Sequence, residues 1–185
     1  MSKKVIFVHG YTASSSVNWY PNISKELDTL RVDYSIRDYP GGEYPRSKEW
    51  LEILDREIHS TDKPTILVGH SLGTRAILLY LNKTEKVFDT VILIAPPGNN
   101  VEKWEKYSEG RVADFFEHKI DLSNMKSRAK KFIVVHSKDD SDVPYEEGVE
   151  IAQGLNAKLI TLEGRDHMSA PESYTYVLDV LKTVL

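Results

Sequence analysis

The segment from Pro64 to Gly73 restricts the fold of this chain more than any other stretch. An apolar, β-branched run ends in Gly-His-Ser-Leu-Gly, and residues at helical spacing follow at once. This is the G-x-S-x-G pattern in the strand–turn–helix setting that it requires. The turn forces Ser71 into a strained backbone conformation, and the two glycines let strand and helix approach closely. The alternative interpretation is an ordinary strand-to-helix turn that merely contains a serine.

Five further segments have the composition of strands. Continuous apolar runs, typical of parallel strands covered on both faces, occupy residues 5–8, 91–94 and 132–135. Residues 32–36 alternate apolar and polar side chains, which predicts a strand near a sheet edge, and residues 157–162 form a short last strand. Apolar residues at helical spacing lie between these runs. The alternation predicts an α/β fold with a mainly parallel sheet, right-handed crossovers and helices on both faces.

The length and the spacing of these segments predict a single domain, residues 1–185. A chain of 185 residues can bury a proper core. No internal repeat, low-complexity segment or linker interrupts it. Residues 97–130 lack a strong period, and so long a connection in a compact domain is more often functional than a plain link. We therefore interpret 97–130 as a small cap segment within the domain.

Composition narrows the classes of function. The formal net charge of −4 argues against an extended nucleic-acid-binding surface. No apolar run approaches the roughly 18 residues of a membrane span, and the first residues do not resemble the start of a signal peptide. The chain has no cysteine, which excludes disulfides, thiolate metal sites and a cysteine nucleophile. We expect a cytoplasmic protein that binds neither nucleic acid nor membrane.

The residues with catalytic chemistry follow the expected strands. His9-Gly10-Tyr11, Ser71 and Asp139-Asp140 come directly after apolar runs, and His167 lies in a loop beyond the last strand. Ligands of open parallel sheets bind at the carboxyl ends of the strands. These residues should therefore gather at one edge of the sheet.

Ser71 needs a partner, because a serine hydroxyl is a weak nucleophile at neutral pH. Histidine is a suitable base, and a carboxylate must orient it. After a G-x-S-x-G serine, the order along the chain is serine, acid, histidine. Only His167 follows a strand-end carboxylate, so we predict Ser71 as the nucleophile and His167 as the base. His70, beside the serine, is interpreted as a packing residue.

Three carboxylates compete for the role of the acid. Asp139, Asp140 and Asp142 all lie in the loop after the run 132–135. Asp166 adjoins His167 in sequence, and a neighbouring carboxylate seldom reaches the outer ring nitrogen. The residue pattern alone leaves the choice among the three open.

Four motifs together resemble a known superfamily. They are His9-Gly10-Tyr11, Gly69-His70-Ser71-Leu72-Gly73, Asp140-x-x-Val143-Pro144 and Gly164-x-x-His167. The chain resembles the α/β hydrolases, and among them the compact serine hydrolases related to retinoblastoma-binding protein 9 and the bacterial YdeN-type proteins. The resemblance covers essentially the whole chain. It implies that Asp140 is the acid of a Ser-His-Asp triad.

An oxyanion hole is expected beside the serine. The turn directs the backbone N–H of Leu72, at a helix N-terminus, toward the carbonyl that the hydroxyl attacks. The resemblance implies a second N–H donor from Tyr11. It also implies a three-layer α/β/α fold in which the first two strands of the full superfamily are missing. Six strands in the order 2-1-3-4-5-6 would remain.

The expected activity is hydrolysis of small or medium carboxylic esters through an acyl-enzyme intermediate. The substrate is a small molecule, and no metal or organic cofactor is required, since the histidines lack ligand spacing. Four aromatic residues are candidates for lining the substrate pocket, with ordinary core packing as the alternative for each: Trp19, Trp104, Phe115 and Phe116.

Two alternatives to an esterase remain open. One is a peptidase or amidase of the same fold, and the other is a protein-binding module in which catalysis is subordinate. No protein partner is identified from the sequence. The basic run at residues 126–131 is interpreted as a solvated face.

Overall fold

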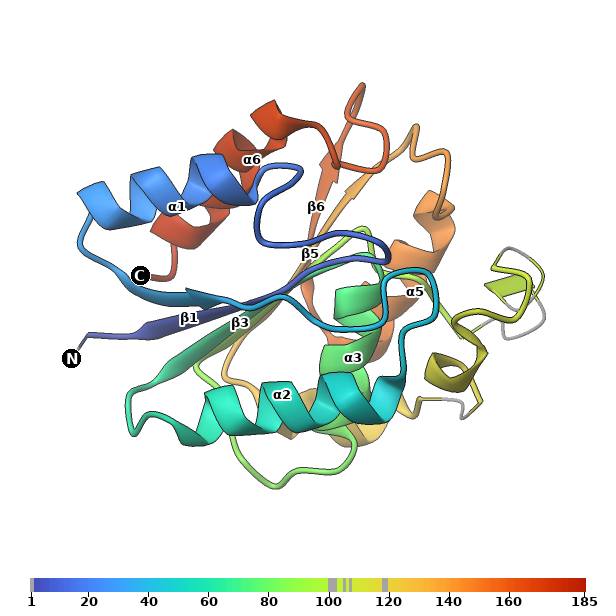
Figure 1. Cartoon of the computed structure of the whole chain (residues 1–185), viewed down its shortest axis with the longest axis horizontal. Helices are drawn as coiled ribbons and strands as arrows, with labels where there is room; N and C mark the ends of the chain where they lie inside the picture. Colours follow the sequence, from blue (N-terminus) through green and yellow to red (C-terminus); the bar gives the residue numbers. More distant parts are fainter. Residues whose placement is uncertain (1, 100–102, 105, 107, 118–119) are drawn as a thin grey trace.

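The computed structural model describes residues 2–99, 103–104, 106, 108–117 and 120–185 (Figure 1). The strands of the described part are β1 (Lys4–Val8), β2 (Asp33–Ile36), β3 (Thr65–His70), β4 (Thr90–Ile94), β5 (Phe132–Ser137) and β6 (Lys158–Leu162). The helices are α1 (Tyr20–Thr29), α2 (Ser47–His59), α3 (Leu72–Leu81), α5 (Tyr145–Leu155) and α6 (Tyr174–Lys182). Short 3₁₀ segments are η1 (Ala113–Phe115), η2 (Leu122–Arg128) and η3 (Pro171–Ser173).

All six strands form one sheet in the order β2-β1-β3-β4-β5-β6. Every neighbouring pair is parallel. The fold class and the strand order predicted from the sequence are therefore confirmed. The half-polar strand β2 lies at one edge, where only one side needs to be covered, and β6 lies at the other.

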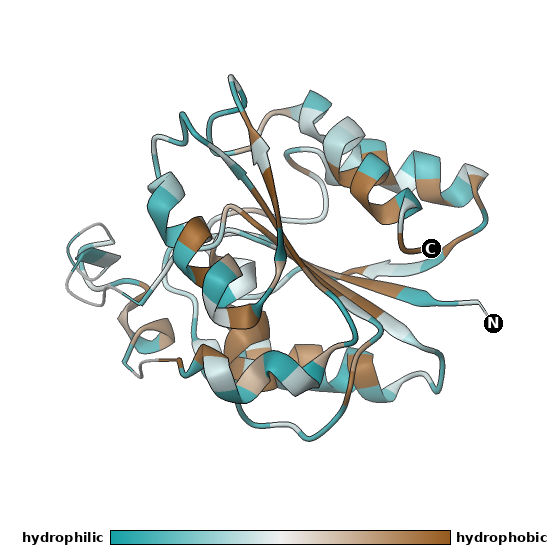
Figure 2. Ribbon diagram, turned by 180° about the vertical axis from the view of Figure 1, so that it is seen from behind, coloured by the Kyte–Doolittle hydropathy of each residue, from teal (hydrophilic) through white to brown (hydrophobic). Residues whose placement is uncertain are grey.

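Alternating side chains of each strand pack into two separate cores. Val5 and Phe7 of β1 face a core built with α1 and α6, whereas Ile6 and Val8 face a core built with α2, α3 and α5. In Figure 1, α1 and α6 cover one face of the sheet, and α2, α3 and α5 cover the other. The apolar central strands lie between these two layers in Figure 2. Two-sided burial explains why β3, β4 and β5 are continuous apolar runs rather than alternating ones.

The start of the last helix differs from its sequence pattern. Ser169-Ala170-Pro171-Glu172 reads as a capping box, in which Ser169 would cap the helix. Instead Pro171 begins the 3₁₀ segment η3, whose cap position is Ala170, and α6 starts only at Tyr174. Ser169 lines a cavity at the carboxyl ends of the strands. Its side chain is thus placed at the candidate site rather than on the helix end.

Candidate active site

Ser71 occupies the turn between β3 and α3 in a strained conformation. Its backbone angles are φ 52° and ψ −123°, a region that side-chain-bearing residues avoid. Neither flanking glycine could carry a side chain. A Cβ at Gly69 would lie 2.8 Å from backbone atoms of Thr74, and one at Gly73 would overlap the carbonyl of Val8. Close contact between strand and helix therefore holds the serine in place, as the G-x-S-x-G pattern predicts.

Asp140 and His167 meet across the loops that follow β5 and β6. Nδ1 of His167 lies 3.0 Å from both carboxylate oxygens of Asp140. The side chain of Asp140 is fully buried and that of His167 is 11% exposed. The structure therefore brings the imidazole to Asp140, one of the three carboxylates between which the residue pattern could not decide. The other ring nitrogen, Nε2, lies 4.0 Å from Oδ2 of Asp142 and can exchange a proton.

The carboxylate of Asp140 is held in its ionised form by several donors. Burial raises the pKa of Asp140, but hydrogen bonds from His136 and His167 outweigh it and hold the pKa well below its usual range. Backbone N–H groups of Asp142 and Val143 donate to Oδ1 at 2.9 and 2.8 Å. An ionised carboxylate at this position can orient an imidazole and stabilise its charged form.

Asp139 has a different partner, the backbone of the loop that carries the histidine. Its Oδ1 accepts the N–H of Gly164 at 2.8 Å and the hydroxyl of Ser137, and its Oδ2 accepts the N–H of Asp166 at 3.2 Å. The hydrogen bond from Ser137 is the main reason why the pKa of Asp139 falls to about 2. Asp166 in turn accepts the N–H of Ser141 at 2.9 Å. The acid loop and the histidine loop therefore brace each other.

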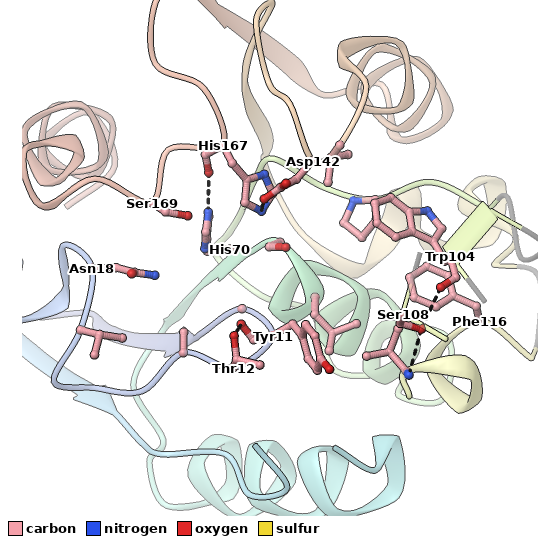
Figure 3. A pocket seen from close by; sticks show the side chains of 18 residues that line it. Tyr11, Thr12, Asn18, His70, Trp104, Ser108, Phe116, Asp142, His167 and Ser169 are labelled. Atoms are coloured by element: carbon pink, nitrogen blue, oxygen red, sulfur yellow. Dashed lines mark hydrogen bonds and ion pairs between the residues drawn. The ribbon is translucent and has the colours of Figure 1, made fainter. Parts of the chain in front are cut away.

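Asp142, the third candidate, lies on the opposite side of the imidazole. Its Oδ2 is 4.0 Å from Nε2 of His167, and its side chain is 43% exposed. Figure 3 shows Asp142 beside His167 at the rim of the pocket. The Asp142 carboxylate therefore brings negative charge to the cavity, on the side of the imidazole away from Asp140.

His70 is buried beneath the histidine loop. Its Nε2 lies 2.8 Å from the backbone carbonyl oxygen of His167, the contact drawn as a dashed line in Figure 3. Burial lowers the pKa of His70 to about 3, with the neighbouring His167 ring as a second cause. The centre of the neutral His70 ring lies 6.1 Å from the centre of the Trp19 ring, as expected for a packing residue. The hydrogen bond of His70 also anchors the loop of His167, a role that the sequence did not indicate.

A cavity of about 260 Å³ opens at this edge of the sheet (Figure 3). Ser71 and His167 both line it. The remaining lining residues are Gly10, Tyr11, Thr12, Ala13, Val17, Asn18, His70, Leu72, Pro97, Trp104, Ser108, Val112, Phe116, Asp142, Val143 and Ser169. The volume lies just below the usual range for small-molecule sites, which suits a compact ligand.

Both residues expected to supply oxyanion N–H groups also line this cavity. Leu72 is the first residue of α3, so its N–H precedes the first intrahelical hydrogen bond and is directed out of the helix end. Tyr11 lies in the loop after β1, and its hydroxyl donates to the carbonyl of Glu43 at 2.9 Å. This contact fixes the direction of the Tyr11 side chain.

The four aromatic residues proposed for the pocket divide into two groups. Trp104 and Phe116 line the cavity, and their rings stack with centres 5.6 Å apart and an interplanar angle of 16°. Trp19 and Phe115 are not among the residues that line the cavity. Both are 0% exposed, Trp19 packing on Phe7 under α1 and Phe115 on Trp50 of α2. The spacing of aromatic residues could not tell which face of the chain they occupy.

Two charged residues that the sequence did not single out, the buried Arg75 and the half-buried Glu147, hold the segment bearing Trp104. Arg75 of α3 is 1% exposed, and its Nε–H donates to the carbonyl of Phe115 at 2.8 Å. Its Cζ lies 4.7 Å from the centre of the Phe116 ring. Glu147 of α5 accepts Trp104 Nε1 at 3.2 Å and the N–H of Gly98 at 2.6 Å. The aromatic wall of the cavity is therefore fixed from two helices. Part of the predicted cap, 97–130, lies outside the described residues.

The described residues contain no group of three or more His, Cys, Asp or Glu side chains placed to hold a metal ion. Within the same residues, no helix combines the length and the hydrophobicity that crossing a membrane requires.

A parallel six-stranded sheet in this order, with a strained serine between its third strand and the following helix, defines an α/β hydrolase. The sequence profile of the serine hydrolase family matches residues 5–183, and the chain belongs to that family. The protein is therefore a hydrolase.

Relatives of this chain agree with that assignment. YdeN of Bacillus subtilis (strain 168) is 33% identical over 98% of this chain and 95% of its own length, and its crystal structure has a TM-score of 0.86 over 100% and 98% of the two chains. The serine hydrolase RBBP9 of Rattus norvegicus is 26% identical over 90% of this chain and 86% of its own. Est1E of Butyrivibrio proteoclasticus, solved with ferulic acid bound, shares the fold with a TM-score of 0.80 at 18% identity, over 98% and 89% of the two chains.

Proposed function

We propose that this protein is a cytoplasmic carboxylesterase that works through Ser71, His167 and Asp140. The Ser71 hydroxyl attacks the ester carbonyl while Nε2 of His167 takes its proton. The backbone N–H groups of Leu72 and Tyr11 stabilise the oxyanion. The alcohol then leaves with the proton from His167, and water repeats the sequence on the acyl-enzyme.

One observation carries the proposal. The Asp140 carboxylate bonds Nδ1 of His167, while His167 and the strained Ser71 line the same cavity. An acid on the inner nitrogen and a nucleophile on the cavity side of the ring are the two requirements for base catalysis. The burial of Asp140 adds to this, because a carboxylate shielded from water interacts more strongly with the imidazolium.

The substrate that fits best is a small or medium ester. A cavity of about 260 Å³ leaves little room for a long acyl chain. Trp104, Phe116 and Val112 offer an apolar surface on one side of the cavity, and Thr12, Asn18 and Ser169 offer polar groups elsewhere in its wall. We place the acyl chain on the apolar side. No cofactor takes part in this reaction.

A fluorophosphonate probe tests the mechanism. We expect covalent labelling of Ser71 in the wild type and none in Ser71→Ala, together with a loss of several orders of magnitude in ester hydrolysis for Ser71→Ala and His167→Ala. Ser169→Ala, another serine of the cavity, is the matched control and should be labelled normally. Absence of labelling in folded wild-type protein would favour a binding module. Faster turnover of amides than of matched esters would favour a peptidase or amidase.

A further inference from the structure

Asp140 bonds a second histidine besides His167. Nε2 of His136, in β5, lies 3.1 Å from Oδ2 of Asp140 and 3.0 Å from the carbonyl oxygen of Val143. The side chains of His136 and Asp140 are both 0% exposed. The carboxylate therefore lies between two imidazoles, one at the cavity and one in the interior. The mechanism above uses only the first.

The surroundings of His136 determine which of its nitrogens carries the proton. Nε2 faces two acceptors, the Asp140 carboxylate and the Val143 carbonyl. Nδ1 is buried and has no hydrogen-bond partner in the part of the chain that the structure describes. A buried N–H without an acceptor is costly, whereas an unpaired ring nitrogen costs less. The proton is therefore placed on Nε2, where it is donated toward Asp140.

Gly148 of α5 makes room for this arrangement. A Cβ at position 148 would overlap Nδ1 of His136, so any larger residue would displace the ring. Glycine inside a helix is unfavourable relative to alanine. The position is thus unfavourable for the helix alone and is explained by the imidazole that packs on it.

We propose that His136 is a positioning residue of the active site, which fixes the Asp140 carboxylate so that it presents its oxygens to Nδ1 of His167. The inference rests on the proposed function, since it assigns His136 a role in the same reaction. The Nε2–H donor restrains rotation of the carboxylate and shares its charge. Asp140 then binds the imidazolium firmly without holding its proton through the catalytic cycle.

The groups that face His136 belong to the loop after β5 and to α5. Asp140 and Val143 lie in the loop after β5, and Tyr145 of α5 packs edge-on with ring centres 5.8 Å apart. His167 reaches His136 only through the shared carboxylate. Changes in pH dependence on altering His136 are therefore transmitted by Asp140.

A pair of variants of equal length separates positioning from packing. Glutamine places an amide N–H close to the position of Nε2, whereas methionine fills similar space without a donor. We expect His136→Met to lower kcat on the order of tenfold to a hundredfold with little change in KM. The acid limb of its kcat/KM profile should move to higher pH, because Asp140 then attracts the protonated His167 more strongly. His136→Gln should restore most of both properties.

Gly148→Ala, a substitution in α5 outside the cavity, would displace the His136 ring from the Asp140 carboxylate. We expect it to lower kcat like His136→Met, although alanine favours the helix. Nitrogen-15 NMR of histidine-labelled wild-type protein provides a measurement that needs neither a variant nor activity. His136 should show a proton on Nε2 and a bare Nδ1.

Three results would overturn the proposal. They are wild-type kcat and pH profile in folded His136→Met, equal losses in the Met and Gln variants, or a proton on Nδ1 of His136. Failure of the proposed function would look different, because wild-type Ser71 would then not react with the fluorophosphonate whatever the state of His136.

Discussion

Nε2 of the buried His70 imidazole lies 2.8 Å from the backbone carbonyl oxygen of His167, which is 97 residues further along the chain. Nδ1 of His70 is buried without a partner among the described residues, so Nε2 carries the proton and donates it to that carbonyl. The turn that presents Ser71 thus also fixes the backbone of the candidate base. Nucleophile and base are positioned relative to one another by adjacent residues of one strand end.

His70 should make the protein less stable in mild acid. Its pKa is about 3 in the folded protein because of burial, below the ordinary value of 6.5. The unfolded chain therefore binds a proton that the folded one does not, and the free energy of unfolding falls as pH drops from about 6.5 toward 3. His70→Gln keeps a donor for the carbonyl but cannot titrate. It should remove a slope of up to about 1.4 kcal/mol per pH unit from this window.

Urea unfolding at a series of pH values between 6.5 and 4.5 measures that slope. Burial also lowers the pKa of His9, so a part of the slope should persist in His70→Gln. His59→Gln, at an exposed histidine of α2, is the control and should not flatten the curve. Identical slopes in wild type and His70→Gln would contradict the prediction.

Asp139 and Asp140 are neighbours with separate roles, and their variants should behave differently. Asp140→Ala removes the group that orients His167 and should lower kcat by roughly 10³- to 10⁴-fold. Asp139→Ala removes a brace between backbone loops and should lower kcat only about tenfold, through displacement of the histidine loop. Steady-state kinetics on one ester compares the two. A loss in Asp139→Ala as large as that in Asp140→Ala would reassign the acid.

Asp142 should select substrates by charge. Among the described residues that line the cavity, it alone has a carboxylate, placed 4.0 Å from Nε2 of His167. An anionic group on the substrate near this point would be repelled by about 1 kcal/mol in partly solvated surroundings. Asp142→Asn should therefore raise kcat/KM about fivefold for the half-ester of a dicarboxylic acid, relative to a neutral ester of the same size.

The effect of Asp142→Asn should weaken at high salt, because its side chain is 43% exposed. Glu150→Gln, which changes an exposed acid of α5 outside the cavity, controls for net charge and should leave the ratio unchanged. A ratio that is the same in wild type and Asp142→Asn would exclude this role.

Trp104 and Trp19 form a matched pair for the acyl side of the cavity. Trp104 lines it, whereas Trp19 is completely buried beneath α1. Trp104→Phe should lower kcat/KM for a hexanoate ester about fivefold more than for an acetate ester, because the longer chain loses apolar contact area. Trp19→Phe should lower the melting temperature and leave the acetate-to-hexanoate ratio as in wild type. A change of the acetate-to-hexanoate ratio in Trp19→Phe but not in Trp104→Phe would show that Trp19, and not Trp104, contacts the acyl chain.

Much of the fold could be predicted because its determinants are local. Apolar runs and helical spacing define the strands and helices, and the strand order followed from the family resemblance. The alternating pattern of residues 32–36 placed that strand at the edge, where β2 is found. The aromatic residues were harder to assign, since full burial in the core and a place in a cavity wall are both compatible with the same apolar spacing.

The sequence by itself determined the strand–turn–helix segment at Ser71, the parallel sheet and the order of serine, acid and histidine along the chain. Each of these depends on neighbouring residues or on the direction of strands. Only the tertiary structure decided what each carboxylate after β5 does. Asp139 binds a loop, Asp140 binds two imidazoles and Asp142 faces the cavity. The contacts of Asp139 and Asp140 with the loop of His167 join residues more than 20 positions apart. All three roles depend on side-chain directions that a run of similar residues does not encode.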